Sequence, residues 1–172
     1  MSIPFVVSLS IPFVVSLSNH ERNRLDRHLG IPLAVLLAAS SLATAADLPL
    51  PQLKLQVGSH TIQAEVANTP QLREIGLMGR THLDSDAGML FIFEQKATHC
   101  FWMRNTLVPL SIAFLADDGT IIDIQDMQPQ TLTFHCPRGP IRYALEVPQG
   151  GFRSKGIQLG MQVSGGPFGT PP

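Results

Sequence analysis

The spacing of apolar residues predicts a β-hairpin and a helix between residues 53 and 79. Apolar and polar residues alternate over residues 53–57 and again over 62–66, with a Gly-containing turn between them. Strict alternation is typical of strands with one buried face, and the short turn joins these two strands as a hairpin. Thr69 can cap a helix through its hydroxyl group and precedes a proline, so we expect a helix from there to Gly79, a residue suited to end it.

Continuous apolar runs predict strands that are buried on both faces. Residues 89–93 read MLFIF and residues 100–103 read CFWM, and each run suits such a strand. Four more strands are expected, at residues 110–115, 120–124, 142–147 and 157–163. Short strands, a single helix and no repeated strand–helix unit predict a mainly β fold: an antiparallel β-sandwich or jelly-roll-like barrel with one short α-helix.

The chain of 172 residues is expected to hold one domain. We place this domain at residues 46–164, and we expect the Gly- and Pro-rich residues 165–172 to be a flexible tail. Residues 2–9 recur unchanged as residues 10–17. Two copies cannot build a stacked core, so we interpret the segment 1–20 as a tandem duplication without a structural role.

Residues 21–45 have the pattern of a secretory signal peptide. Arginines at positions 22, 24 and 27 form a basic region, and an apolar segment rich in Leu and Ala follows. The small residues after it end at Ala45, which is the predicted cleavage site. We therefore expect an exported protein, periplasmic or secreted, with no stable membrane span once the signal is removed. The alternative is that the segment stays uncleaved as a membrane anchor.

The composition excludes two further classes of protein. Hydrophobic residues make up 44% of the chain and charged residues 15%, which rules out a disordered chain and supports a packed core. The formal charge of −1 lacks the basic excess of a nucleic-acid-binding surface, so no nucleic acid is expected as a partner. The composition predicts no oligomeric state.

Six short motifs occur in an order that resembles a known family. They read GLMGR, GMLFIF, FWMRNT, PLSIAFL, DGTI and RYALE. The arrangement resembles the DUF192 (UPF0127) family of uncharacterised proteins over roughly residues 53–163. The resemblance implies a compact β-sandwich of jelly-roll type with a short helix, and no established activity. The family often has Asp at the position of Ser111 and Gly-Asp at the position of Gly160-Met161, so the resemblance assigns no acidic site to these positions here.

The two cysteines of the chain, Cys100 and Cys136, are expected to form a disulfide. An even pair in a small exported domain is usually oxidised. Each cysteine follows a histidine, so a zinc or copper site built from Cys100, Cys136, His99 and His135 is an alternative. Neighbouring side chains on a strand point to opposite faces, which argues against this site. A cysteine nucleophile activated by one of these histidines would be silenced by oxidation. We predict no metal and no cofactor.

Candidate ligand-binding residues combine arginines, the only Trp and two polar groups. An Arg fork grips a carboxylate or phosphate, and a partly exposed Trp gives an apolar platform. A small anionic or sugar ligand is the partner that this mixture favours. The alternative is that Trp102 belongs to the core and that Arg73 forms a structural ion pair with Glu146. The candidate residues are Arg73, Arg80, Trp102, Arg104, Asn105 and Glu146.

The preferred hypothesis of function is a non-catalytic small-ligand-binding or accessory module of the cell envelope. One alternative is a periplasmic hydrolase that uses carboxylates, for example Glu74 with Glu146. Another is a protein that binds copper or zinc, with methionines such as Met78 as additional soft ligands. No nucleophile elbow, phosphate-binding loop or dinucleotide fingerprint occurs in the sequence, so whether the protein is an enzyme stays open.

Overall fold

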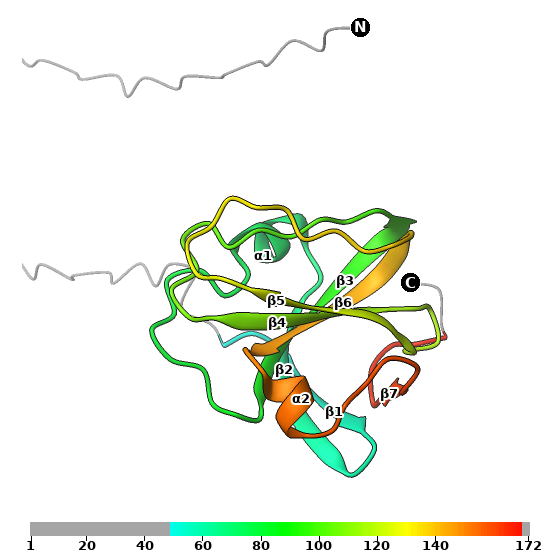
Figure 1. Ribbon diagram of the computed structural model, residues 1–172. Coiled ribbons are helices and arrows are strands. Elements are labelled where there is room, and N and C mark those ends of the chain that lie inside the picture. The colour runs from blue at the N-terminus through cyan, green and yellow to red at the C-terminus, as the bar shows by residue number, and fades with distance from the viewer. Residues whose placement is uncertain (1–48, 170–172) are drawn as a thin grey trace, which may run out of the picture. The chain divides into compact units, whose positions relative to one another are not determined.

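A computed structural model describes residues 49–169, which form seven strands and two short helices. The strands are β1 (Gln52–Val57), β2 (His60–Ala67), β3 (Ala87–Ala97), β4 (Leu110–Leu115), β5 (Ile121–Met127), β6 (Ile141–Pro148) and β7 (Val163–Ser164), and the helices are α1 (Pro70–Ile75) and α2 (Gly151–Ser154). They build one curled sheet in the order β5-β4-β6-β3-β2-β1-β7 (Figure 1). The predicted duplication at 1–20 and the signal peptide at 21–45 lie outside the described residues.

The mainly β, antiparallel fold is confirmed, with one parallel pair. β2 and β3 run parallel, with Ala64 opposite Gly88, because α1 lies between them in the chain and returns it to the same end of the sheet. All the other strand pairs are antiparallel. β6 lies between β3 and β4, so its backbone pairs with a neighbouring strand on both edges.

The C-terminal segment joins the two ends of the strand order. β7 pairs with β1 through Val57 and Val163. The same segment reaches β5, because the amide of Ile121 donates to the carbonyl of Met161 and Thr120 bridges to Gln162. These contacts give the sheet the closed, barrel-like form that the fold prediction included.

Both faces of the sheet are buried, each against its own apolar cluster. On one face, Leu90, Leu145 and Val147 pack with Phe152 of α2. On the other, Met89, Phe91 and their neighbours pack against the segments that carry α1 and residues 100–106. Figure 1 shows α1 and α2 on opposite sides of the sheet. This explains why β4 is buried along its whole length and why its sequence is almost entirely apolar.

The helix begins as predicted and ends earlier. The hydroxyl group of Thr69 accepts a hydrogen bond of 3.2 Å from the amide of Leu72, as expected of a cap. The helix ends at Gly76, which adopts a positive φ of 50°. A Cβ atom at this position would lie 3.3 Å from the ring of Phe91, so both the backbone conformation and the packing favour glycine here.

Two predicted strands are wrong in whole or in part. Residues 100–103 form only an isolated bridge between Phe101 and His135, and the next backbone hydrogen bond, from the amide of Met103 to the carbonyl of Thr131, departs from the register of that bridge. The strand predicted at 157–163 is reduced to β7.

Residues 165–169, the described part of the predicted tail, pack against the domain. The ring of Phe168 lies edge-on to Tyr143, with 5.1 Å between ring centroids. The hydroxyl group of Tyr143 donates a hydrogen bond of 2.9 Å to the carbonyl of Pro167. Phe168, which directly precedes Gly169, therefore anchors this segment to the sheet.

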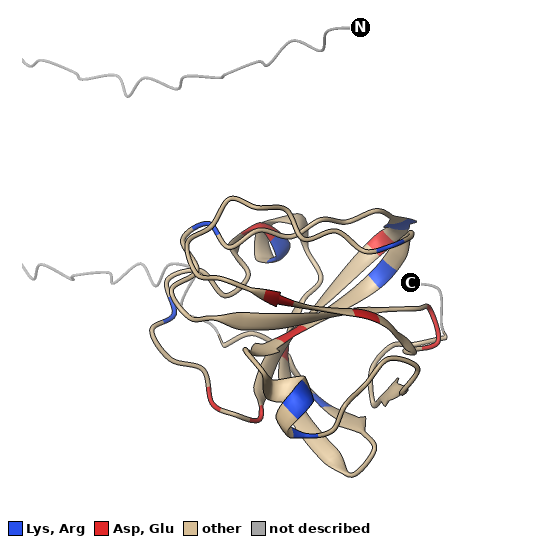
Figure 2. Ribbon diagram, in the orientation of Figure 1, with Lys and Arg blue, Asp and Glu red and all other residues tan. Residues whose placement is uncertain are grey.

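The charged residues of the domain are mixed in sign. Figure 2 shows Lys and Arg positions interspersed with Asp and Glu positions along strands, helices and loops. Within residues 49–169, no helix is long and apolar enough to cross a membrane.

Candidate functional site

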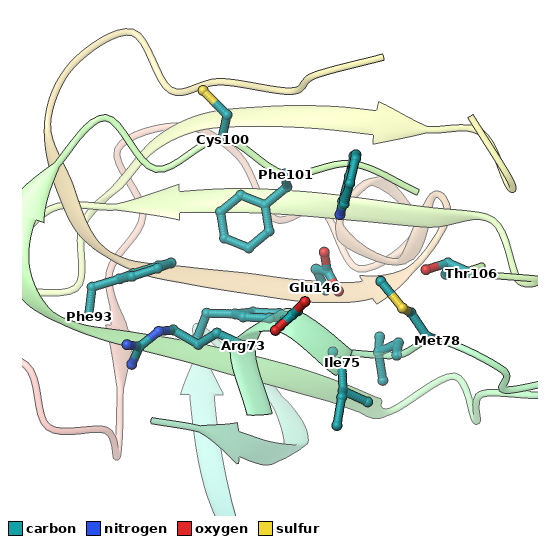
Figure 3. Close-up of a pocket in the computed structure, with 13 residues that line it drawn as sticks. Arg73, Ile75, Met78, Phe93, Cys100, Phe101, Thr106 and Glu146 are labelled. Atoms are coloured by element: carbon teal, nitrogen blue, oxygen red, sulfur yellow. The ribbon is translucent and has the colours of Figure 1, made fainter. Parts of the chain in front are cut away.

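A pocket of about 250 Å³ opens on the α1 side of the sheet. It lies between α1 with the residues that follow it, β3, β6 and the segment 100–106, and Figure 3 shows its wall. Its side chains are mostly apolar, with one arginine and two glutamates. The lining residues are Arg73, Glu74, Ile75, Gly76, Leu77, Met78, Phe91, Phe93, Cys100, Phe101, Trp102, Thr106 and Glu146.

Glu146 lies at the centre of this pocket, with Phe93 and Phe101 to one side and Met78 and Thr106 to the other (Figure 3). Its side chain comes from β6, and the residues opposite it in the sheet are Met89 and Ile112. Both of these neighbours are fully buried, so the strand places a carboxyl group in an apolar layer.

The carboxyl group of Glu146 has no partner in the described part of the chain. The residue is only 5% exposed, and across residues 49–169 no hydrogen bond or ion pair reaches its carboxyl oxygens. Because burial disfavours the charged form, it raises the pKa of Glu146 to about 8. Most copies of this side chain are therefore neutral at pH 7, each with one O–H donor and one free acceptor oxygen.

Arg73 is held at the end of the pocket next to Phe93. Its Nη1 donates a hydrogen bond of 2.7 Å to the carbonyl of Ile92, and its guanidinium lies 5.1 Å from the centroid of the Phe93 ring. The ring of His99 also stacks on Phe93, at 3.6 Å. Arg73 does not pair with Glu146, so the structural ion pair considered in the sequence analysis does not form.

Trp102 lies at the edge of the pocket and is 38% exposed. Its ring is parallel to that of Phe134, with 5.9 Å between centroids, and Phe134 is itself 65% exposed. The guanidinium of Arg104 lies 5.6 Å from the Trp102 ring centroid. The two rings form an exposed apolar platform beside the pocket, so Trp102 is not a core residue.

Three of the six candidate residues, Arg80, Arg104 and Asn105, are not among those that line the pocket. Arg80 forms a two-pronged ion pair with Glu65, with N–O distances of 2.7 and 2.5 Å. Asn105 has a positive φ of 58°, and its carbonyl accepts a hydrogen bond of 2.9 Å from the amide of Gly79. Arg80 and Asn105 stabilise the local structure, and Arg104 contacts the ring of Trp102. Arg73, Trp102 and Glu146 line the pocket.

The predicted disulfide between Cys100 and Cys136 is present, and Cys100 belongs to the pocket wall. It ties the segment that carries Trp102 to the segment that carries Phe134. Because both sulfur atoms are in the bond, neither is free to bind zinc or copper as a thiolate.

Three further methionines that could act as soft metal ligands are core residues. Met89, Met103 and Met127 are fully buried in one apolar cluster. In the described part of the chain, no group of three or more His, Cys, Asp or Glu residues is arranged to hold a metal ion.

A second pocket, of about 300 Å³, lies beside α2 and contains polar groups that bond to one another. The hydroxyl group of Ser111 donates to Asp126 at 2.5 Å and accepts from the amide of Gly150 at 2.9 Å. Arg153 pairs with the same Asp126 at 3.2 Å. These groups satisfy each other and hold α2 against β4 and β5, so the pocket around Glu146 is the stronger candidate site.

Comparisons with known proteins agree on the family and give no activity. Residues 53–165 match the model of DUF192, described as "Uncharacterized ACR, COG1430". None of the curated proteins compared with the chain matches it.

Two solved structures are similar to this chain. One is a candidate transcription regulator from Sinorhizobium meliloti 1021, at 32% identity and a TM-score of 0.67, covering 69% of this chain and 97% of that one. The other is a protein of unknown function from Novosphingobium aromaticivorans DSM 12444, at 32% identity and a TM-score of 0.65, covering 67% of this chain and 86% of that one. The family match spans most of the chain, which therefore belongs to the DUF192 family.

Proposed function

We propose that this protein is an exported accessory module that binds a small molecule in the pocket around Glu146. The observation that carries the proposal is a carboxyl group that is buried, has no protein partner and faces a pocket. Burying a polar group without a partner costs stability, and a ligand that bonds to the carboxyl group would offset that cost. Perturbed titratable groups in pockets are typical of functional sites.

Export is supported by the signal-peptide pattern at residues 21–45 and by the disulfide. Disulfides persist in oxidising compartments such as the periplasm and are rare in the cytosol. The bond between Cys100 and Cys136 therefore agrees with an envelope location, and the two observations are independent of each other.

A small anionic or sugar ligand is proposed on the residues that line the pocket. Arg73 has guanidinium N–H groups beyond the one bonded to Ile92. Trp102 and Phe134 offer the flat apolar surface on which the apolar face of a sugar ring can lie. The regulator description of the Sinorhizobium meliloti protein is not carried over, because a formal charge of −1 and the mixed charges of Figure 2 disfavour a nucleic-acid surface.

The test is native mass spectrometry of the protein released from the periplasm, followed by titration with sugars and carboxylates while Trp102 fluorescence is recorded. We expect a retained small molecule, or a ligand that changes the fluorescence. Glu146→Leu should abolish binding, whereas Glu94→Gln, which changes an exposed carboxyl group outside the pocket, should bind like the wild type. Equal binding by the wild type and Glu146→Leu would remove the proposal.

A hydrolase is the second candidate, because Glu74 and Glu146 line the same pocket. Burial raises the pKa of Glu146 to about 8, which suits a general acid, while the exposed Glu74 suits the carboxylate that acts as base or nucleophile. In that reaction, Glu146 would protonate the glycosidic oxygen, and water would supply the hydroxyl group at the anomeric carbon. Hydrolysis of a bound glycoside that is lost in both Glu74→Gln and Glu146→Gln would favour the enzyme.

A further inference from the structure

We infer that the pocket anchors its ligand through an uncharged group that both donates and accepts hydrogen bonds, a hydroxyl or an amide, and not through an ammonium or a carboxylate group. This inference rests on the proposed function and decides between its two ligand classes at the Glu146 end of the pocket: a sugar hydroxyl fits there, and an anion does not.

The surroundings of Glu146 contain no charge that pairs with it. Of the elements packed around it, α1 contributes the titratable groups Arg73 and Glu74, and β3 and β4 contribute apolar side chains. The segment 100–106 contributes Phe101, Trp102, Thr106 and the disulfide-bonded Cys100. Because no cation reaches the carboxyl group, burial keeps it in the neutral form.

A carboxylate ligand would lie beside Glu146 without a counter-ion. The guanidinium of Arg73 bonds to the carbonyl of Ile92, which is three residues along β3 from Met89, the residue opposite Glu146. Three residues of strand span about 10 Å. Among residues 49–169, Arg73 is the cation that lines the pocket, and it is bonded at the Ile92 end. Burying an anion at the Glu146 end is unfavourable, because most of its hydration is lost and little is regained.

An ammonium ligand is disfavoured for a different reason. It would have to remove the proton of Glu146, so that two charges are desolvated together in an apolar site. Phe93, one of the aromatic rings of the pocket wall, already contacts both Arg73 and His99.

An uncharged hydroxyl or amide fits the protonated carboxyl group without any change of ionisation. The O–H group of Glu146 donates to the ligand oxygen, and its carbonyl oxygen accepts from the ligand O–H or N–H. Around this pair, the walls formed by Phe91, Phe101 and Trp102 suit a ring. A volume of about 250 Å³ lies just below the usual range of ligand pockets, which favours a molecule the size of one substituted ring.

The experiment compares four probes that share a ring and differ in the polar group: benzyl alcohol, benzamide, benzoate and benzylammonium. Their dissociation constants for the exported protein are measured by ligand-observed NMR at about pH 6 and about pH 9. At the lower pH, we expect the two uncharged probes to bind at least about tenfold more tightly than the two ions. At the higher pH, Glu146 ionises, so the two uncharged probes should lose about tenfold in affinity.

Variants separate the role of Glu146 from a general effect on the fold. Glu146→Gln offers the same donor and acceptor without ionising, so it should keep the uncharged probes at both pH values. Glu146→Leu should lose them, and Glu94→Gln should match the wild type. Thermal unfolding of each variant shows that it is folded.

Tighter binding of benzoate or benzylammonium in the pocket would overturn the inference and leave the proposed function standing. Equal binding of all four probes would also overturn it. If none of the four binds to the wild-type protein, both the inference and the proposed function fall.

Discussion

Glu146 makes the stability of the domain depend on pH, because its carboxyl group is buried without a partner. Its pKa is about 8 in the folded protein and close to 4.5 in the unfolded chain. Between these values the folded state holds more protons, so the free energy of unfolding falls as the pH rises from about 4.5 to about 8. Well above pH 8, Glu146 has lost its proton in both the folded and the unfolded state, so the free energy of unfolding no longer changes with pH through this group.

Glu146→Gln should remove this pH dependence. We expect the variant to gain stability over the wild type at pH 8, on the order of a few kcal/mol, and the gain to shrink towards pH 5. Thermal unfolding of both proteins between these two pH values checks the prediction. A difference in stability that stays constant with pH would show that Glu146 is not neutral in the folded protein.

Gly88 lets β3 and β6 approach closely at the level of Glu146. A Cβ atom at Gly88 would lie 2.6 Å from the carbonyl oxygen of Glu146, too close for any side chain. Gly88→Ala should therefore destabilise the domain by about 1 to 3 kcal/mol. Chemical denaturation measures this, with Gly139→Ala as the matched control, because nothing lies within 4 Å of a Cβ atom there. Equal stability of the two variants would contradict the expected clash.

The sequence could predict which residue types matter at the site but not how they group. In the sequence of β6, Arg142, Ala144 and Glu146 alternate with Tyr143 and Leu145, a pattern that puts Glu146 on the less apolar face of the strand. In the structure both faces of β6 are covered, because a second apolar cluster closes over the expected polar face. Alternation within one strand carries no information on what lies above it. Closeness in sequence is misleading in a similar way. Arg80 lies seven positions from Arg73 in the chain, but its guanidinium bonds to Glu65.

The elements that the sequence predicted well are those with local causes. The hairpin of β1 and β2 follows from alternation and a glycine turn, and the start of α1 follows from its cap. The segment 100–103 was predicted as a strand because its own pattern is apolar. Whether it pairs depends on the distant residues 131–136, where one bridge and a disulfide replace a ladder. That pairing is not encoded near the segment itself.

The disulfide should stabilise both the fold and the pocket wall. Its cysteines are separated by 36 positions, and closing a loop of this size is worth about 4 kcal/mol on the chain-entropy model. We expect the double variant Cys100→Ser with Cys136→Ser to lose stability of this order and to show a changed Trp102 emission. Thermal unfolding and fluorescence measure the two effects. An unchanged melting temperature together with unchanged emission would mean that the platform of Trp102 and Phe134 holds without the bond.

The fold class was predictable from the whole molecule, and the parallel pair was not. Many short strands with a single clear helix already exclude a doubly wound sheet. β2 and β3 can pair in parallel because α1 and the residues after it cross over the sheet between them. Nothing in the sequences of the two strands indicates this crossover. The crossing also forms the pocket, because it places Arg73 and Glu74 over the face that carries Glu146.

Export of the whole chain predicts a defined product. If the signal peptide is removed after Ala45, protein recovered from the periplasm should begin at Ala46 and be lighter than the reduced chain by two hydrogen atoms, since the disulfide forms there. Denaturing mass spectrometry measures both. Ala45→Phe should block cleavage, because the site requires a small residue, whereas Ala46→Phe should be processed normally. A full-length, reduced protein confined to the cytosol would contradict export, and the pocket would then meet the ligands of another compartment.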